Sequence, residues 1–128
     1  MRAIFLAIWL AGCSGDDAAA PALAAYDAGQ LALERGDSAG AAAFFSEARV
    51  ADPGSAALCE WHAHALAEAG DVPGALTVYA DGLARFPDAE GLRYNRAALR
   101  ARSGDAAGAA TDLQILYNRG MLDPGETG

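Results

Sequence analysis

The chain has 128 residues, of which 53% are hydrophobic, and this length fits a single domain. All 9 basic residues are arginine, and 17 acidic residues outnumber them, which gives a formal net charge of −8 at pH 7. This acidic balance argues against nucleic acids and anionic membrane surfaces as electrostatic partners. The two cysteines are too few for a disulfide framework.

Residues 1–12 have the pattern of a targeting segment. Arg2 supplies a positive start, and an uninterrupted apolar run follows from Ala3 to Leu10. This run is much shorter than the roughly 20 residues that a membrane-spanning helix needs. The residues Leu10-Ala11-Gly12-Cys13 resemble the lipobox of bacterial lipoproteins, in which small residues precede a cysteine. The resemblance implies cleavage before Cys13 and lipidation of Cys13; the alternative is an uncleaved apolar terminus with an unmodified cysteine.

Residues 13–21 are expected to form the lipidated N-terminus and a flexible tether. The stretch from Ser14 to Pro21 is small and polar and lacks apolar periodicity. In the enterobacterial rule an aspartate after the lipidated cysteine favours the inner membrane, whereas Ser14 follows here. Several acyl chains hold a domain firmly at a bilayer. We therefore expect a lipid-anchored protein of the bacterial cell envelope, on the periplasmic face of the outer membrane.

A six-residue phrase, Gly-Asp-x-x-Gly-Ala, occurs three times in the rest of the chain. Its copies begin at Gly36, Gly70 and Gly104, at a constant interval of 34 residues. A fixed interval of this size is typical of solenoids, which stack one supersecondary unit repeatedly. The first glycine is placed to end one helix, and the aspartate is placed to cap the next. For the second glycine we expect close approach of a neighbouring helix or simple tolerance near a helix start.

From Ala22 onward the chain resembles the tetratricopeptide repeat family, whose helix–turn–helix unit has about 34 residues. With the Gly-Asp turns aligned, the repeats are 22–55, 56–89 and 90–123, and a C-terminal tail follows at 124–128. The positions that match the family pattern are Gly29, Gly36, Ala41, Phe45, Ala48 and Pro53, then Ala63, Gly70, Ala75, Tyr79 and Pro87, then Tyr94, Asn95, Ala97, Gly104 and Ala109.

The resemblance implies an all-α fold, a right-handed α-solenoid of three helix–turn–helix repeats. Apolar residues at helical spacing, such as Leu76, Tyr79 and Leu83, support this independently. Pro53 and Pro87 stand where helices must stop. The expected helices lie near 22–35, 38–51, 56–69, 72–85, 90–103 and 106–118.

In this family, peptides bind in a concave groove lined mainly by the first helix of each repeat. The groove positions of this chain hold aromatic residues together with a few polar ones, a mixture that suits an extended or helical segment of another protein. The alternative is a solvated surface without a ligand. Carried over by position, the groove residues are Tyr26, Gln30, Leu33, Glu60, His64, Glu68, Tyr94, Ala98 and Arg102.

The family's carboxylate clamp, which grips acidic C-terminal peptides, is not present here. Its basic and asparagine positions are only partly filled by polar residues, so binding of chaperone tails is disfavoured. These positions hold Tyr26, Gln30, Trp61, Gly91 and Asn95.

The third repeat carries an arginine stripe where the family has large apolar residues. Arg93, Arg96 and Arg100 share one helix face by their i, i+3, i+7 spacing. We favour pairing of this stripe with the chain's own carboxylates over an acidic partner. The candidate carboxylates are Glu90, Asp105 and Asp112.

The C-terminal end of the last repeat is apolar and has no following capping helix, although solenoid ends usually carry polar caps. It contains Leu113, Ile115, Leu116, Tyr117, Met121 and Leu122. Two alternatives stay open. Either the tail folds over this end, or the end is a dimer or partner interface made by Leu113, Leu116 and Tyr117.

A cysteine and two histidines form the one cluster that suggests chemistry. Cys59 and His62 are one helical turn apart, but a zinc site needs at least three protein ligands. A Cys59 nucleophile with His62 or His64 as its base lacks an orienting third group and an oxyanion hole. We therefore expect Cys59 and His62 to pack between helices and His64 to be partly exposed, with no metal, cofactor or catalytic residue.

Together these features predict a non-catalytic protein–protein interaction adaptor or scaffold. The protein would be a membrane-anchored lipoprotein that presents its groove to another cell-envelope protein. The alternative is a structural subunit or homodimer that uses the apolar C-terminal end.

Overall fold

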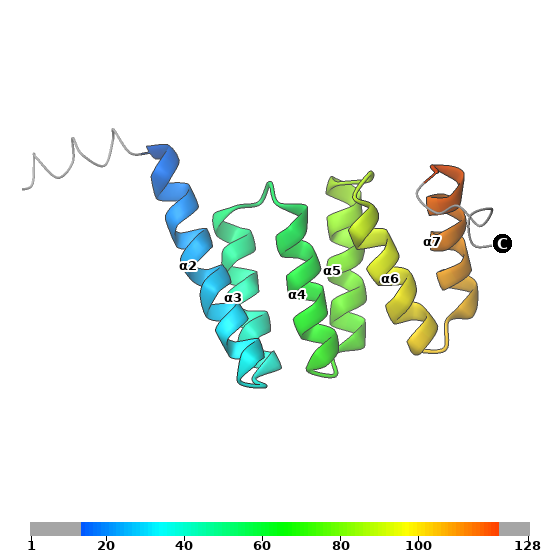
Figure 1. Ribbon diagram of the computed structural model, residues 1–128, viewed down its shortest axis with the longest axis horizontal. Coiled ribbons are helices and arrows are strands. Elements are labelled where there is room, and N and C mark those ends of the chain that lie inside the picture. Colours follow the sequence, from blue (N-terminus) through cyan, green and yellow to red (C-terminus); the bar gives the residue numbers. More distant parts are fainter. Residues whose placement is uncertain (1–13, 121–128) are drawn as a thin grey trace, which may run out of the picture.

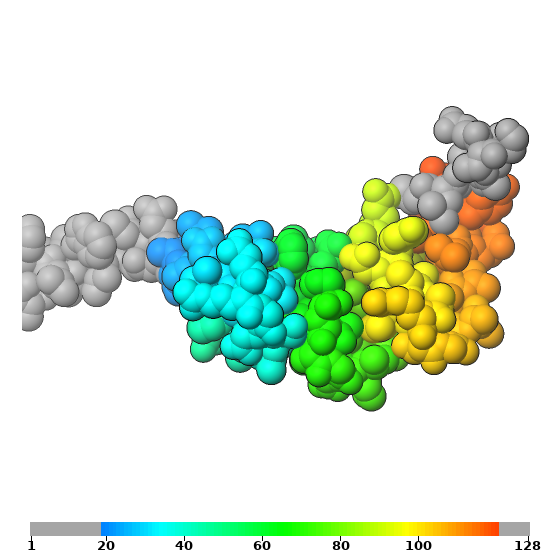
Figure 2. Space-filling view, turned by 60° about the horizontal axis from the view of Figure 1, so that its bottom comes forward, coloured from blue at the N-terminus to red at the C-terminus, as the bar shows by residue number. Residues whose placement is uncertain are grey.

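The computed structural model describes the backbone of residues 14–120 and the side chains of residues 19–120. The proposed targeting segment, Cys13 and the tail at 124–128 lie outside this range. Within residues 14–120, six α-helices follow one another in chain order along the long axis (Figure 1). They are α2 (Ser14–Glu34), α3 (Ser38–Ala51), α4 (Ala56–Glu68), α5 (Val72–Arg85), α6 (Glu90–Arg102) and α7 (Ala106–Asn118). The space-filling view shows the same order of segments from blue to red (Figure 2).

The helices form three pairs, α2 with α3, α4 with α5, and α6 with α7. Helix α3 packs on α4, and α6 packs on both α4 and α5, so contacts join each pair mainly to the next. Helix α7, at the end of this array, is held by α6 (Figure 1). The predicted all-α solenoid of helix–turn–helix repeats is confirmed.

The first helix is longer than the sequence predicted. Helix α2 begins at Ser14, so it runs through the segment that we expected to be a flexible tether. Three alanines from Ala18 to Ala20 have the highest helix propensity, and they favour continuation of the helix toward its N-terminus. Pro21 lies inside the helix and removes one backbone hydrogen bond there. The propensity of the alanines therefore outweighs the proline that we took as the end of the tether.

The Gly-Asp turns have the geometry that the repeated phrase predicted. Gly36, Gly70 and Gly104 have φ angles of 79°, 91° and 91°, a left-handed conformation that glycine adopts without a Cβ penalty. The following Asp37 donates its backbone N–H to the carbonyl of Ala32 at 2.8 Å, as in a Schellman motif. Each turn therefore closes one helix with backbone hydrogen bonds before the next begins.

At Gly40 and Gly74 the second glycine of the phrase has a cause other than the two that were expected. Asp37 Oδ1 accepts a hydrogen bond from the backbone N–H of Gly40 at 2.9 Å, and Asp71 does the same for Gly74. A Cβ atom added at Gly40 or Gly74 would collide with this capping carboxylate. Neither simple tolerance nor a neighbouring helix explains these glycines, because the cap of their own helix fills the space.

This arrangement predicts coupling between Asp71 and Gly74. Gly74→Ala displaces the cap, which costs about 1 kcal/mol, but gains about 0.5–1 kcal/mol of helix propensity, so the net change is small. In the Asp71→Ala background the cap is already absent, and Gly74→Ala then stabilises the protein by about 0.5–1 kcal/mol. Urea unfolding of the four proteins in this double-mutant cycle gives the coupling energy. Additive effects would show that the carboxylate and the glycine are independent.

Two larger apolar clusters, and a smaller one of Ala25, Ala48 and Leu58, pack the described helices against one another. Phe45 of α3 is fully buried at the first, together with Ala32, Ala42 and Ala65. Gly29 of α2 permits this packing, because a Cβ there would lie 2.6 Å from the Phe45 ring. The second cluster contains Cys59, Ala63, Ala75, Val78, Tyr79, Leu83, Leu92 and Leu99.

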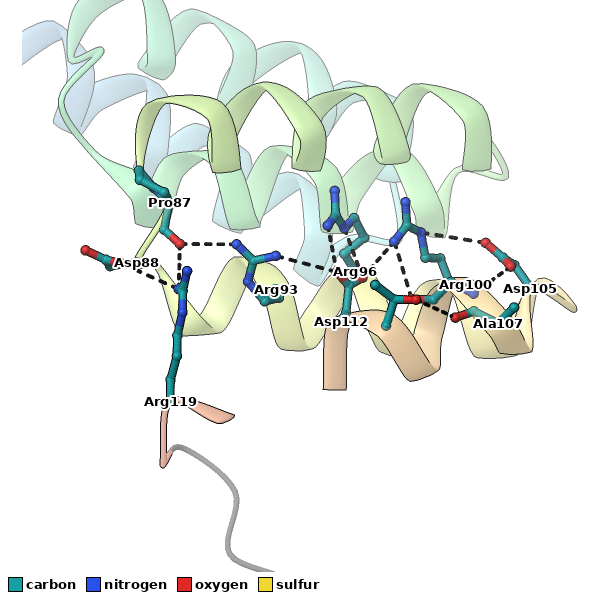
Figure 3. A network of polar contacts seen from close by, with 11 residues as sticks. Pro87, Asp88, Arg93, Arg96, Arg100, Asp105, Ala107, Asp112 and Arg119 are labelled. Atoms are coloured by element: carbon teal, nitrogen blue, oxygen red, sulfur yellow. Dashed lines mark hydrogen bonds and ion pairs between the residues drawn. The ribbon is translucent and has the colours of Figure 1, made fainter. Parts of the chain in front are cut away.

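In the third repeat the arginine stripe of α6 joins α6 to α7 (Figure 3). Asp112 of α7 is fully buried and accepts two hydrogen bonds from Arg96, at 3.0 and 2.6 Å. Arg100 donates to the same carboxylate at 2.9 Å, and Arg93 lies 3.7 Å from it. The predicted pairing of the stripe with the chain's own carboxylates is confirmed, with Asp112 as its centre.

Candidate functional site

A pocket of about 370 Å³ lies between the first helices of the second and third repeats. Helix α4 forms one wall and α6 the other, while the nearly buried Tyr79 of α5 lies at its base. Its lining residues are Ala57, Glu60, Trp61 and His64 of α4, Tyr79 of α5, and Asn95, Ala98 and Arg102 of α6.

Helical periodicity brings these side chains to one place. The lining residues of α4 follow the spacing i, i+3, i+4, i+7 from Ala57, so they share one helix face. Asn95, Ala98 and Arg102 do the same on α6. Because α4 contacts α6 directly, the two faces border a common space.

Glu60 is the most constrained polar group of the pocket. Asn95 Nδ2 donates a hydrogen bond to Glu60 Oε1 at 3.1 Å, which joins α4 to α6. A Cβ added at Gly91 would lie 2.5 Å from the same oxygen, so the absence of a side chain there makes room for the carboxylate. Burial raises the pKa of Glu60 above its usual range. Burial, followed by the charge of Glu60, also raises the pKa of Tyr79, against a smaller opposing effect of Arg102.

Four of the groove residues predicted from the sequence meet in this pocket, and five do not. Glu60, His64, Ala98 and Arg102 line it. Glu68 and Tyr94 are exposed on the same two helices but do not line the pocket. Tyr26, Gln30 and Leu33 lie on α2 and do not line the pocket, although Tyr26 packs edge-on against Trp61 at 6.3 Å.

The α2 residues have a packing role in the structure. Tyr26 and Leu33 are partly buried against the cluster around Phe45. The amide nitrogen of Gln30 is buried without a hydrogen-bond partner among the described residues. This part of the predicted groove therefore has less free surface than the pocket between α4 and α6.

Four lining residues were missing from the predicted groove: Ala57, Trp61, Tyr79 and Asn95. Trp61 and Asn95 occupy equivalent positions in successive repeats, 34 residues apart, and this signal was available. Trp61 also packs against Phe45, with ring centroids 5.8 Å apart, and meets His64 edge-on at 6.0 Å. The pocket wall is therefore continuous with the apolar core.

The apolar C-terminal end differs from the prediction at one of its three residues. Leu113 and Tyr117 of α7 are 37% and 48% exposed, but Leu116 is only 2% exposed. Ala109, Asp112 and Leu116 share the buried face of α7 by their i, i+3, i+7 spacing. Leu116 is therefore not available as an interface residue in this structure, whereas Leu113 and Tyr117 are.

Cys59 and His62 lie in different environments, the first in an apolar cluster and the second beside Arg49. Cys59 is a buried free thiol next to Gly82, in the second apolar cluster. Arg49 Nη1 donates to His62 Nδ1 at 3.0 Å and also binds Asp81 at 2.8 Å. Among the residues whose side chains are described, no group of three or more His, Cys, Asp or Glu side chains could hold a metal ion.

The environment of His62 predicts an acid-sensitive contribution to stability. Burial and the adjacent Arg49 lower the pKa of His62 from 6.5 to about 4 in the folded protein. The unfolded chain therefore binds this proton more tightly, so the contribution is complete above pH 6.5 and is lost as the pH falls toward 4. Because the His62 ring is only partly buried, solvent screening reduces the expected loss to roughly 2 kcal/mol over this window.

Urea unfolding between pH 7 and pH 4 measures this loss. His62→Gln retains an acceptor for Arg49 without titrating, so its free energy of unfolding should depend less on pH. His64→Gln, at the exposed neighbouring histidine, is the matched control and should keep the slope of the parent. An equal slope in the His62 variant would contradict this assignment.

Comparisons with known proteins agree with this architecture. Residues 32–102 match the family model of the tetratricopeptide repeat, which covers α3 to α6 and the end of α2. No curated protein matches the chain significantly. Among residues 14–120, no helix has both the length and the apolar character needed to cross a membrane.

Proposed function

Because the chain belongs to the tetratricopeptide repeat family, whose domains generally mediate protein–protein interactions, we propose that it is a non-catalytic adaptor. It presents the pocket between α4 and α6 to a segment of another protein of the cell envelope. The single observation that carries this proposal is the pocket, which combines aromatic walls with a few fixed polar groups.

The proposed anchor supplies the location. Cleavage before Cys13 and lipidation of its thiol tether the repeats to a membrane, and the residue after the cysteine favours the periplasmic face of the outer membrane. This part of the proposal rests on the sequence Leu10-Ala11-Gly12-Cys13. An anchored adaptor acts by local concentration, because its partner meets the groove within the narrow space next to the bilayer.

Intact-mass measurement tests the anchor. The protein is isolated from membrane fractions beside a Cys13→Ala variant. The expected mass is that of Cys13–Gly128 plus acyl groups, and the variant should lack both changes. An unprocessed and unmodified mass for the parent would remove the anchor and the envelope location from the proposal.

Site-specific photo-crosslinking in cells tests the groove. A photoreactive amino acid at Ala57, which lies at the exposed edge of the pocket, should yield one defined adduct with another protein. The same amino acid at the exposed Ala101 of α6, outside the pocket lining, is the matched control. Ala98→Phe fills the pocket without removing a polar group and should abolish the adduct from Ala57, whereas Ala101→Phe should not.

A second candidate function is a homodimer or structural subunit. The exposed Leu113 and Tyr117 on α7, the last helix that the structure describes, favour it. Under this alternative, a photoreactive group at Tyr117 gives an adduct of twice the chain mass, and the pocket variants have no effect. Adducts from neither surface would contradict both candidates.

A further inference from the structure

Glu60 has one carboxylate oxygen fixed by a hydrogen bond and a second that could accept one from a ligand. Its Oε1 receives the hydrogen bond from Asn95, and the bare Cα of Gly91 makes room for the carboxylate beside α6. No hydrogen bond reaches Oε2 from the residues whose side chains the structure describes. The carboxylate is thus held by one hydrogen bond from the opposite wall, in space that Gly91 leaves free, and retains acceptor capacity toward the pocket.

No cation within the described part of the chain neutralises this carboxylate. The arginines of α6 that face α7 are committed to Asp112, and Arg49 is committed to Asp81. The described ion pairs do not include Glu60. Its pKa is raised by burial, which means that the charged form is poorly solvated. A cation from outside the chain would supply the missing compensation.

The walls next to Glu60 suit a long side chain that ends in a positive charge. Trp61 offers aromatic surface for a methylene stem and for a cation, and Tyr79 adds the small part of its ring that is exposed. Ala57 and Ala98 leave room between the helices. The pocket volume of about 370 Å³ equals that of roughly twelve water molecules at about 30 Å³ each. This is room for one long side chain.

Arg102, which also lines the pocket, favours one direction for such a side chain, with its positive end at Glu60. It lies seven residues after Asn95 on α6, which places it about 10 Å farther along the helix axis. No ion pair joins Arg102 to Glu60 among the described residues, so Arg102 leaves the carboxylate open to a cation from the partner. The pocket therefore has a negative end at Glu60 and a positive end at Arg102.

We propose that this pocket takes a lysine or arginine side chain from the partner's segment, with its charged end on the Glu60 carboxylate and its stem between Trp61 and Tyr79. The inference rests on the proposed adaptor function and specifies the chemistry of its partner. It also agrees with the net charge of −8, which attracts basic segments over acidic ones.

Binding of three short peptides to the full-length chain tests the proposal. The probes are blocked pentapeptides, Gly-Gly-X-Gly-Gly, in which X is arginine, its neutral isostere citrulline, or glutamate. Affinities come from titrations monitored by amide chemical shifts in α4 and α6. We expect the arginine peptide to bind at least about tenfold more tightly than the citrulline peptide, and the glutamate peptide to bind least.

Two matched variants assign this preference to Glu60. Glu60→Gln keeps an oxygen for Asn95 and removes the charge, so it should abolish the preference for arginine over citrulline. Glu68→Gln makes the same change at an exposed position of α4 outside the pocket and should keep the preference. Equal binding of arginine and citrulline, a preference that survives in the Glu60 variant, tighter binding of the glutamate peptide, or no binding of any peptide would each overturn the inference.

The photo-crosslinking experiment separates this inference from the proposed function. A defined adduct from Ala57 that Ala98→Phe abolishes, without a preference for the arginine peptide, would retain the adaptor function and reject the cationic partner. If Ala57 gave no defined adduct, or if Ala98→Phe left the adduct unchanged, the groove itself would be rejected, whatever the peptides show.

Discussion

Asp112→Asn should lower the free energy of unfolding by about 3–5 kcal/mol. The carboxylate is fully buried, and its removal leaves the guanidinium groups of Arg96 and Arg100 without the charge that compensates them. Burial, followed by the charges of Arg119 and Arg96, already lowers the pKa of Arg93, so positive charge is in excess at this interface. We expect the melting temperature, measured by circular dichroism, to fall by more than about 12 °C.

Asp88→Asn is the matched control for this prediction. Asp88 also pairs with an arginine, Arg119 at 3.4 Å, but its side chain is 92% exposed. Exposed ion pairs contribute little, so a change below about 1 kcal/mol is expected. Because α7 is held by α6, hydrogen exchange in the Asp112 variant should increase most in these two helices. Equal effects of the two substitutions would contradict the central role of Asp112.

Phe45→Ala should destabilise the other end of the solenoid by about 3–5 kcal/mol. The ring is fully buried and stacks on Trp61 at 5.8 Å, while Tyr26 packs against it at 6.1 Å. Its removal leaves a cavity that the alanines around it are too small to fill. Urea unfolding followed by circular dichroism measures the loss.

The adjacent phenylalanine gives a control of the same chemistry. Phe44 is 37% exposed, against 0% for Phe45, although the two are consecutive on α3. Phe44→Ala should therefore cost less than about 1.5 kcal/mol, since little area returns to water and no cavity forms. A loss as large as that of Phe45→Ala would show that both rings are part of the core.

These two positions also bear on the pocket, since each supports one of its walls. Phe45 stacks on Trp61, which lines the α4 wall. Arg96 binds Asp112 from α6, next to Asn95, which faces the pocket. Asp112→Asn should therefore loosen the contact between Asn95 and Glu60, although Asp112 does not line the pocket. Asp112→Asn should also weaken peptide binding, because the α6 wall of the pocket is displaced. The test of the cationic partner therefore rests on the Glu60 variant.

The sequence alone predicted the repeats and five of the six helices closely, because their signals are local. A glycine with positive φ, and an aspartate whose carboxylate accepts a hydrogen bond from the backbone N–H three residues later, need no information from elsewhere in the chain. Two misjudgements were also local. The capping carboxylate, and not a neighbouring helix, explains Gly40, and α2 continues through Pro21 to Ser14.

Only the tertiary structure decided which side chains meet across helices. The contact between Glu60 and Asn95 joins residues 35 positions apart, and that between Arg96 and Asp112 joins residues 16 apart. Periodicity places each side chain on a face of its own helix but does not say how neighbouring helices are rotated against each other. That rotation buried Leu116, packed Tyr26 against the Phe45 cluster, and left Glu60 at the pocket. The rotation of one helix against the next is set by the packing of their whole surfaces, which depends on all the contacts between them together.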